Sequence, residues 1–498
     1  MKYIFLFVNP TSGGNKASIF TEFGVNEIIF HKPHKCHFFI YNILEGEKGK
    51  KPGFLNLRSI TNNPRKFESK AFSSFSKSKS FTDKNNLSLE NKDSLIKRKY
   101  LSKEKIPTNS NRDSNDKNID LDKHNEHECE KNKELVNETK CNELNCESKS
   151  DRKENELLSK RSNENKDISI YVLVAGGDGT LNWVLKESES YNINNNKFAV
   201  GVIPFGTGND FARAFGWKKI DGIFNHSFLF NILKKIVDQT FKSKIEKHDY
   251  WNIEVVLKKD GYFNKINSKT KKKETLKENN ENITELKLCM SNYFSIGIDS
   301  RIGRGFERHR KKNALCNKIV YAVEGFKKIS FKKNIPVNLI IDKMVAGENY
   351  DNVIFTTNNS EVYPLLKKSM SIICINIPSY SSGNDIWNYT HKIGLNLPKN
   401  LTSDEKKVYD ELKKSQQEVG DGILEFVIYQ SGIDLGLEFT LKGRAYRVHQ
   451  GIGPWKIFFK EQKYNVYFQV DGEYYLMSLP NYISICHYKK INVLKNIL

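Results

Sequence analysis

The sequence lacks long apolar runs, paired cysteines and a recognisable leader. No stretch of about 18 consecutive apolar residues occurs in the 498-residue chain, so no segment is expected to span a bilayer. The eight cysteines have no regular spacing, which argues against a secreted disulfide framework and favours a reducing compartment. The apolar opening MKYIFLFV is short and no small-residue cleavage site follows it, so we interpret it as a first buried strand.

Two common site signatures are also missing. His124, His127, Cys129, Cys141 and Cys146 lie close together, but their spacing matches neither a C-x2-C pair nor a familiar zinc finger. We therefore interpret them as incidental residues of a polar tract. The sequence contains no GxxxxGK[ST] loop, so a phosphate site must be built in another way.

Acidic residues are in the minority. The formal net charge of +21 favours anionic partners such as nucleic acid, nucleotides or acidic lipid surfaces. Nucleic acid is not expected, because the sequence has no recognition motif and no platform of alternating aromatic and basic residues. Many of the lysines are scattered through polar stretches, where solvation of disordered segments explains them as well as a membrane patch does.

Two polar stretches divide the chain. Residues 59–166 consist mainly of Lys, Asn, Ser and Glu with few aromatics, a composition that predicts a disordered insert. A shorter insert of the same kind is predicted at 258–285. The remaining residues suffice for two domains, one built from 1–58 and 167–248 and one from 249–490.

The segment YVLVAGGDGTLNWVL, residues 171–185, has two interpretations. Asp178-Gly179 between two apolar runs is typical of a β-hairpin turn. Alternatively, residues 171–175 are a fully buried strand, and Leu181, Val184 and Leu185 lie on one face of a helix that Thr180 caps. In that case the amides of the turn point at an anion from a helix N-terminus.

Two further segments favour the anion-binding interpretation. The apolar residues 3–8 precede NPTSGG, and residues 198–203 precede PFGTGND, with a predicted helix at 211–215. In an open parallel sheet such loops gather at the carboxyl ends of the strands, where ligands bind. We therefore predict an α/β N-terminal nucleotide-binding domain with a parallel sheet and glycine-rich loops.

The second half of the chain reads as a β-rich domain. Segments 251–257, 371–377, 423–429, 465–470 and 473–478 are rich in aromatic and β-branched residues, with Gly, Pro and Asn between them. The last two form a predicted hairpin with Asp471 and Gly472 in its turn. Turn chemistry explains these two residues but not Glu473.

The glycine-rich loops carry a family resemblance. VNPTSGG, GGDGTLNWVL and VIPFGTGNDFARAFGW, in this order, resemble the catalytic domain of eukaryotic diacylglycerol kinases, within the superfamily that includes sphingosine and ceramide kinases. HDYWNIEV, SNYFSIGIDSRIGRGFERHR, INIPSYSSGNDIW, VGDGILEFVIY and FQVDGEYY resemble the accessory domain of these kinases. The resemblance covers nearly everything outside the polar inserts, and the ordered co-occurrence of the strings is strongly specific.

The resemblance implies transfer of the ATP γ-phosphoryl group to the primary hydroxyl of diacylglycerol, giving phosphatidic acid, with Mg²⁺ required. We expect the active site in the cleft between the two domains. The family's lipid-recruiting zinc modules are absent, so we expect a cytoplasmic protein that associates peripherally with an anionic membrane surface. The alternatives are a sphingoid-base or ceramide kinase, or an inactive lipid-binding relative.

The resemblance also implies the site residues. The general base is either Asp471, supported by Glu473, or Asp178, and the sequence does not separate the two. Asp178 and Asp210 are the expected magnesium ligands. The nucleotide is expected to contact Asn9, Ser12, Gly13, Gly176, Gly177, Asp178, Gly179, Thr180, Gly206, Thr207 and Asn209. A run of four arginines either includes a contact to the ATP phosphates or is solvated surface charge. These are Arg301, Arg304, Arg308 and Arg310.

Overall fold

The computed structural model describes residues 1–22, 24–63, 81–82, 168–206, 208–219, 226–267, 269–310, 314–330, 334–462 and 464–497. Most of the predicted insert 59–166 therefore lies outside the described residues. Its predicted start is too early, because helix α3 (Pro52–Asn62) continues past Arg58 and buries Ile60 and Thr61 against the core.

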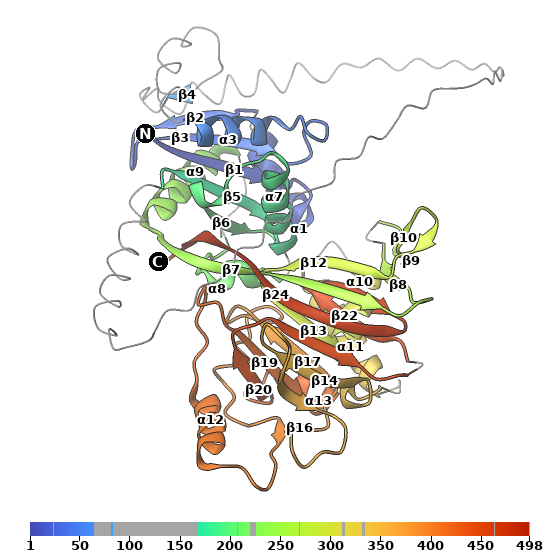
Figure 1. Cartoon of the computed structure of the whole chain (residues 1–498). Helices are drawn as coiled ribbons and strands as arrows, with labels where there is room; N and C mark the ends of the chain where they lie inside the picture. Colours follow the sequence, from blue (N-terminus) through green and yellow to red (C-terminus); the bar gives the residue numbers. More distant parts are fainter. Residues whose placement is uncertain are drawn as a thin grey trace, which may run out of the picture. The chain divides into compact units, whose positions relative to one another are not determined.

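The N-terminal region contains the predicted parallel sheet (Figure 1). Four strands run parallel in the order β6-β5-β1-β3, and β5 and β6 are buried along their whole length, as their uninterrupted apolar sequences require. The strands of this region are β1 (Lys2–Val8), β2 (Glu27–Phe30), β3 (Cys36–Asn42), β4 (Phe81–Thr82), β5 (Ile170–Gly176) and β6 (Phe198–Pro204).

Helices cover this sheet. Besides α3 they are α1 (Ser12–Asn15), α2 (Ile19–Glu22), α7 (Asp178–Ser190), α8 (Asp210–Ala214) and α9 (His226–Lys242). Helix α7 follows β5 directly, so the GGDGT segment joins a strand to a helix and is not a hairpin turn. Leu181, Val184 and Leu185 are buried as predicted, but the helix cap is Gly177. Thr180 is the third residue of the helix and not its cap, so its predicted capping role is wrong.

The C-terminal region consists mainly of two antiparallel sheets with a shared apolar core. The predicted strands near 251–257, 371–377, 423–429, 465–470 and 473–478 are all present. The strands are β7 (Lys244–Leu257), β8 (Phe263–Ile266), β9 (Lys273–Thr275), β10 (Lys277–Glu278), β11 (Glu281–Asn282), β12 (Glu285–Met290), β13 (Tyr293–Gly297), β14 (Ile341–Ala346), β15 (Asn352–Thr356), β16 (Leu365–Leu366), β17 (Ser371–Ile375), β18 (Leu395–Asn396), β19 (Leu424–Tyr429), β20 (Tyr446–Gly451), β21 (Trp455–Phe459), β22 (Val466–Val470), β23 (Glu473–Met477) and β24 (Pro480–Lys495).

The two long strands β7 and β24 connect the regions (Figure 1). They pair with each other from Pro480 to Lys495, and the end of β24 runs parallel to β6 through Asn492 and Val493. The sheet is therefore continuous from one region into the other, and the predicted domain boundary at 248/249 falls inside β7.

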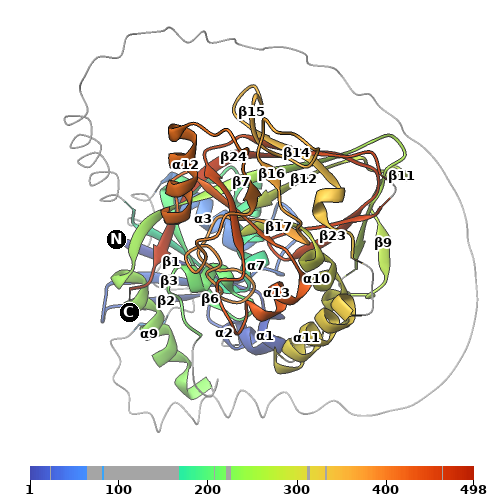
Figure 2. The same cartoon turned by 90° about the horizontal axis from the view of Figure 1, so that it is seen from below.

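A layer of helices covers the outer side of the β20-β19-β17-β13-β22-β23-β8-β9 sheet (Figure 2). These are α10 (Ile298–His309), α11 (Ala314–Ser330) and α13 (Gly432–Leu437), while α12 (Ser403–Lys414) packs near β20. In the part of the chain that the structure describes, none of the helices combines the length and apolar character needed to cross a bilayer.

The polar stretch 258–285 differs from its predicted disorder. It contributes β8 to β11, and β8 pairs with β23 through Phe263 and Met477. Phe263 and Ile266 are 0% and 4% exposed, and Phe263 packs into the core of the C-terminal region. The Lys- and Asn-rich composition predicted disorder wrongly because pairing with a strand that is distant in sequence supplies the burial that the segment itself lacks.

Candidate active site

The three glycine-rich loops leave the same edge of the parallel sheet. Strands β1, β5 and β6 end level with one another, since Val8 pairs with Ala175 and Ala175 pairs with Ile203. The amide of Asn9 donates to the carbonyl of Ala175 at 3.0 Å and continues this alignment into the first loop. The predicted convergence at the carboxyl ends of the strands is therefore present.

Glycines let the backbones of these loops touch. A Cβ at Gly206 would lie 2.8 Å from Cα of Gly177 and 2.6 Å from Oδ1 of Asn209. Gly13 has a φ of +64°, and a Cβ there would lie 2.9 Å from the carbonyl oxygen of Phe205. Because no side chain fits at either position, backbone groups face the space that a phosphate would take.

Side chains fix the loops to one another. Asn9 Nδ2 donates to Thr180 Oγ1 at 3.2 Å, while Asn9 Oδ1 accepts from the amide and hydroxyl of Thr11. The amide of Ser12 closes a turn on the carbonyl of Asn9 at 3.0 Å. Asn9 therefore organises the first loop and links it to the second. Thr207, predicted to contact the nucleotide, lies outside the described residues.

Two glycines of GGDGT have different surroundings. Gly176 is buried, and a Cβ there would lie 2.7 Å from Oγ1 of Thr180, so this glycine permits close packing. Gly179 is exposed with no heavy atom within 4 Å of the position of a Cβ. It lies in the first turn of α7, where amides without an acceptor in the helix attract anions.

Asp178 combines a satisfied oxygen with a free one. Its Oδ2 accepts from the amides of Asp210 at 2.9 Å and Phe211 at 3.4 Å, and from Asn292 Nδ2 at 3.0 Å. Its Oδ1 is buried and has no hydrogen-bond partner among the described residues. Burial and the nearby carboxylates of Asp210 and Asp471 raise the pKa of Asp178 to about 7.

Both carboxylate oxygens of Asp210 are occupied. Oδ1 accepts from Ser379 Oγ at 2.7 Å and from the amides of Ser382 at 2.8 Å and Gly383 at 3.0 Å, and Oδ2 accepts from Tyr293 OH at 3.0 Å. All four donors belong to the C-terminal region. Asp210 therefore anchors that region to the start of α8 and has less capacity left for a metal ion than was expected.

Asp471 has five donors. Its Oδ1 accepts from the amides of Asn292 at 2.8 Å and Tyr293 at 3.1 Å. Its Oδ2 accepts from the amide of Ser291 at 2.7 Å, Ser291 Oγ at 2.9 Å and Asn182 Nδ2 at 2.9 Å. Burial raises the pKa of Asp471, whereas these hydrogen bonds lower it. The turn residue thus ties the segment between β12 and β13 to helix α7.

Glu473 is not part of this cluster. Its carboxylate is exposed and accepts from Tyr475 OH at 2.7 Å, on the same strand. The structure gives it no contact with Asp471, so the predicted supporting role has no geometric basis.

The arginines of α10 are also placed away from the loops. Arg301 Nη1 donates to Asn334 Oδ1 and Arg304 Nη2 donates to Asn264 Oδ1, both at 2.7 Å. Arg308 and Arg310 are exposed near the end of the helix. These contacts lie within the C-terminal region and favour the structural and surface interpretation of the run.

Several hydrogen-bond donors at the candidate site were not identified from the sequence. Asn182, Asn292, Tyr293 and Ser379 are neutral donors to the three aspartates. They occur in LNW, SNYFS and IPSYSS, strings that carry the family resemblance. Neutral polar residues outside a glycine-rich loop gave no local signal of their own, because their role depends on contacts between distant segments.

Among the residues that the structure describes, no cationic side chain donates to the acidic groups of the site. All hydrogen-bond donors to Asp178, Asp210 and Asp471 are neutral. Asn209 Oδ1 is a second buried oxygen without a partner in the described part of the chain. Free carboxylate and amide oxygens suit Mg²⁺, which uses one or two protein ligands and keeps several waters. Asp178 and Asn209 therefore fit this ion better than Asp210.

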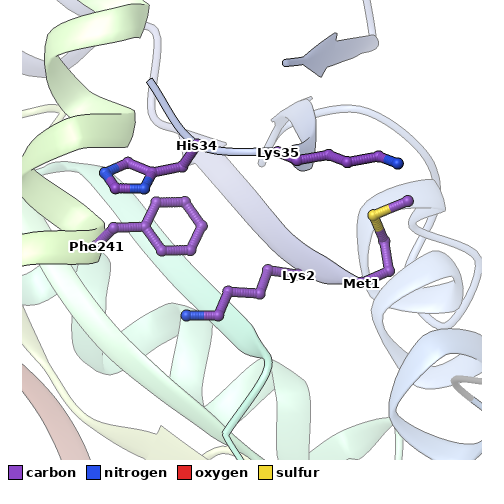
Figure 3. A pocket seen from close by; sticks show the side chains of 5 residues that line it. All are labelled: Met1, Lys2, His34, Lys35 and Phe241. Carbon is purple, nitrogen blue, oxygen red and sulfur yellow. The ribbon is translucent and has the colours of Figure 1, made fainter. Parts of the chain in front are cut away.

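A cavity of about 470 Å³ lies elsewhere (Figure 3). It is lined by Met1, Lys2, His34, Lys35 and Phe241. Lys2 begins β1, whereas Asn9 follows its other end, and a strand of this length separates the two by roughly 20 Å. The cavity belongs to the end of the sheet opposite to the glycine-rich loops.

The arrangement matches the needs of phosphoryl transfer. Amides at the start of α7 and in the glycine-rich loops can hold phosphate oxygens. Beside them, a buried carboxylate oxygen of raised pKa is free to accept a proton from a hydroxyl group. Phosphoryl transfer depends mainly on such positioning and on neutralisation of charge.

Comparisons with known proteins agree with this geometry. Residues 122–241 match the diacylglycerol kinase catalytic domain, and residues 289–474 match the diacylglycerol kinase accessory domain. The chain is 28% identical over 274 residues to probable diacylglycerol kinase 3 of Caenorhabditis elegans, a match that covers 53% of this chain and 30% of that protein. It is 26% identical over 340 residues to diacylglycerol kinase 4 of Arabidopsis thaliana, covering 61% and 62% of the two chains.

Diacylglycerol kinase 5 of Arabidopsis thaliana is similar at 25% identity over 353 residues, covering 65% of this chain and 64% of that protein. The chain thus spans less than two thirds of each of these relatives. Matches to both domains, in the expected order, accompany a fold and a set of converging loops that a nucleotide-dependent kinase requires. The chain belongs to the diacylglycerol kinase family.

Proposed function

We propose that the chain is an ATP-dependent diacylglycerol kinase, which transfers the γ-phosphoryl group of ATP to the primary hydroxyl of diacylglycerol and gives phosphatidic acid. The observation that carries the proposal is the free, buried Oδ1 of Asp178 beside the converging glycine-rich loops. The reaction takes place in a cleft between a nucleotide-binding domain, which carries the glycine-rich loops and includes α3 to Asn62, and an accessory domain, which continues from it through the paired strands β7 and β24.

Asp178 is the better candidate for the general base. A base needs a free oxygen within reach of the hydroxyl and a pKa near the working pH. Asp178 offers both, whereas each oxygen of Asp471 already accepts at least two hydrogen bonds. We therefore assign Asp471 to positioning: it holds Asn292, which in turn donates to Asp178.

We assign phosphate binding to the glycine-rich loops and to Arg213, which was not identified from the sequence. Arg213 of α8 is exposed, and its side chain packs against Gly383, where a Cβ would lie 3.1 Å from Cδ of Arg213. The Nε of Arg213 donates to the carbonyl oxygen of Gly208 over a long distance of 3.4 Å. Arg213 forms no ion pair with any described residue. A free guanidinium at this loop suits the charge of a nucleotide's phosphates.

Because Oδ1 of Asp178 is assigned to proton transfer, magnesium would be held by Asn209 Oδ1 together with phosphate oxygens, and would neutralise charge on the transferred group. The lipid substrate implies that the protein works at a membrane surface from the cytoplasmic side. An anionic surface is favoured by the net charge of +21.

The test is a lipid-substrate assay of the purified chain. With ATP and Mg²⁺ in mixed micelles, we expect phosphatidic acid from diacylglycerol and little product from sphingosine or ceramide. A chain that binds ATP but phosphorylates none of these lipids would be an inactive relative. If the chain preferred a sphingoid base as acceptor, it would instead be a sphingoid-base kinase of the same superfamily.

A further inference from the structure

The outer helical layer of the C-terminal region exposes apolar side chains. Helices α10, α11 and α13 lie side by side (Figure 2), and a Cβ at Gly432 of α13 would lie 2.9 Å from both Ile298 of α10 and Ile329 of α11. The inner faces of α10 and α13 are buried through Ile302 and Leu435.

We call the exposed side of α11, α13 and the turn after it the α11–α13 face. Its large apolar side chains are Val323 at 43%, Phe326 at 63%, Ile433 at 62%, Phe439 at 41% and Leu441 at 53% exposure. A single exposed apolar residue is ordinary, but several on adjoining helices indicate a surface that is covered in use.

The fully exposed charges of this face are basic among the described residues, while Asp434 of α13 is half-buried and accepts from Ser431 Oγ at 2.6 Å. Lys327 and Lys442 are exposed, the latter with its Nζ 4.1 Å from the ring of Tyr389. Two further acidic residues are turned inward. Glu324 is 5% exposed, and Glu438 is 3% exposed and accepts from three backbone amides of the following turn. Apolar groups bordered by lysines match the chemistry of an anionic lipid surface.

A series of residue contacts links the helical layer that carries this face to the candidate site. Helix α10 follows β13, whose first residue Tyr293 donates to Asp210. The ring of Tyr293 packs edge-on against Tyr380 at 4.9 Å, and Tyr380 OH donates to Asp299 in the first turn of α10 at 3.1 Å. One short path of contacts thus joins the active-site carboxylates to the helical layer.

We infer that the α11–α13 face docks on the surface of an anionic lipid bilayer and presents the active site to diacylglycerol within it. The inference rests on the proposed function. A second copy of the chain suits the face poorly, because both copies would bring exposed lysines and inward-turned acids to the contact. The lipid surface supplies both the apolar phase and the negative charge.

The test uses two double variants of the full chain. F326S/I433S removes the two most exposed apolar groups of the face, and V362S/V408S removes valines that are 76% and 61% exposed elsewhere. Binding to vesicles of phosphatidylcholine with phosphatidylserine is measured by co-sedimentation. We expect F326S/I433S to bind about tenfold more weakly or worse, since each substitution removes an apolar side chain that the bilayer would bury. The control should bind like wild type.

Activity separates docking from catalysis. F326S/I433S should lose turnover of diacylglycerol in vesicles but keep wild-type turnover of a dispersed short-chain diacylglycerol. Vesicle binding equal to wild type, or an equal loss on both substrates, would overturn the inference. A wild-type dimer that F326S/I433S dissociates would assign the face to a second copy and overturn it also. If wild type phosphorylates no diacylglycerol, yet wild type and V362S/V408S bind vesicles and F326S/I433S does not, the proposed function fails while the docking surface stands.

Discussion

The three aspartates of the site differ in what occupies their oxygens. Asp210 and Asp471 accept four and five hydrogen bonds, whereas Asp178 has one free, buried oxygen. A carboxylate whose donors are all in place stabilises the fold. A buried carboxylate lowers the free energy of unfolding when one of its oxygens has no hydrogen-bond donor and other carboxylates lie nearby. Such groups concentrate at functional sites.

Asparagine substitutions should therefore have opposite effects on stability. Asp178→Asn removes a buried charge that lacks full compensation, so we expect it to raise the unfolding free energy by about 1–3 kcal/mol near neutral pH and lower kcat by about 10²–10⁴-fold. Asp471→Asn places an NH2 group against N–H donors and should lower stability by about 2–4 kcal/mol. Denaturant unfolding without nucleotide or metal, and steady-state kinetics, measure both.

The stabilisation by Asp178→Asn should depend on pH. The pKa of Asp178 is about 7 in the fold and 3.8 in its ordinary state, so the folded chain holds this proton over that interval more tightly than the unfolded chain. Wild-type stability is then lost as pH rises through the interval, and the advantage of the variant grows until about pH 7 and is constant above it. A pH-independent difference would contradict the charge explanation.

Arg213 provides a second prediction at the residue scale. If its guanidinium contacts nucleotide phosphates, Arg213→Ala should lower kcat/KM for ATP by about 10–100-fold, with Arg213→Lys recovering only part because lysine lacks the planar fork. Lys218→Ala is the matched control, since this exposed lysine lies shortly after α8 and carries the same charge. Equal effects of Arg213→Ala and Lys218→Ala would reduce the role of Arg213 to general surface charge.

At the scale of elements, the glycine-rich loops depend on contact between backbones. Gly206→Ala would place a methyl group 2.8 Å from Cα of Gly177, where no side chain can move aside. We expect the loops to separate and ATP binding to weaken by about tenfold or more, as overpacking costs about 1–3 kcal/mol. Gly208→Ala is the control in the same loop, because its nearest contact is 3.4 Å. Titration calorimetry with ATP compares them.

The predictable part of the structure is local. Continuous apolar runs identified β1, β5 and β6, and the glycines that follow them identified the loops, because both signals lie within a few residues. Asn292 and Ser291, which donate to Asp178 and Asp471, come from a segment more than a hundred residues away from either aspartate. For this reason the sequence left the choice between the two carboxylates open.

Burial across segments also explains the wrong prediction for 258–285. Phe263 and Ile266 are too few to predict a strand in a Lys- and Asn-rich stretch, yet β23 offers an edge and a core to receive them. The composition of a segment indicates how much apolar surface the segment can bury by itself. Pairing with a distant strand adds to that burial, so composition alone predicted disorder wrongly.

At the scale of the whole molecule, the two regions share structure instead of being joined by a flexible linker. β24 pairs with β7 through most of its length and then enters the N-terminal sheet beside β6. Residues close to the end of the described chain thus belong to the core of the region that carries the glycine-rich loops. Loss of this strand end should affect a nucleotide site whose loops lie far away in sequence.

Truncation after Lys490 tests this coupling. It removes Ile491, Val493 and Leu494, which are at most 1% exposed, and the carbonyl of Leu494 that accepts from Trp217 Nε1 at 2.7 Å. Since each buried aliphatic side chain contributes about 2–5 kcal/mol, we expect ATP-dependent thermal stabilisation to be lost. Truncation after Asn496 is the control, because it removes Ile497, which is 57% exposed, together with the last residue, and leaves the paired strand intact. If both truncated chains respond to ATP like the full chain, the N-terminal region is stable without β24, and the shared sheet does not couple the two regions.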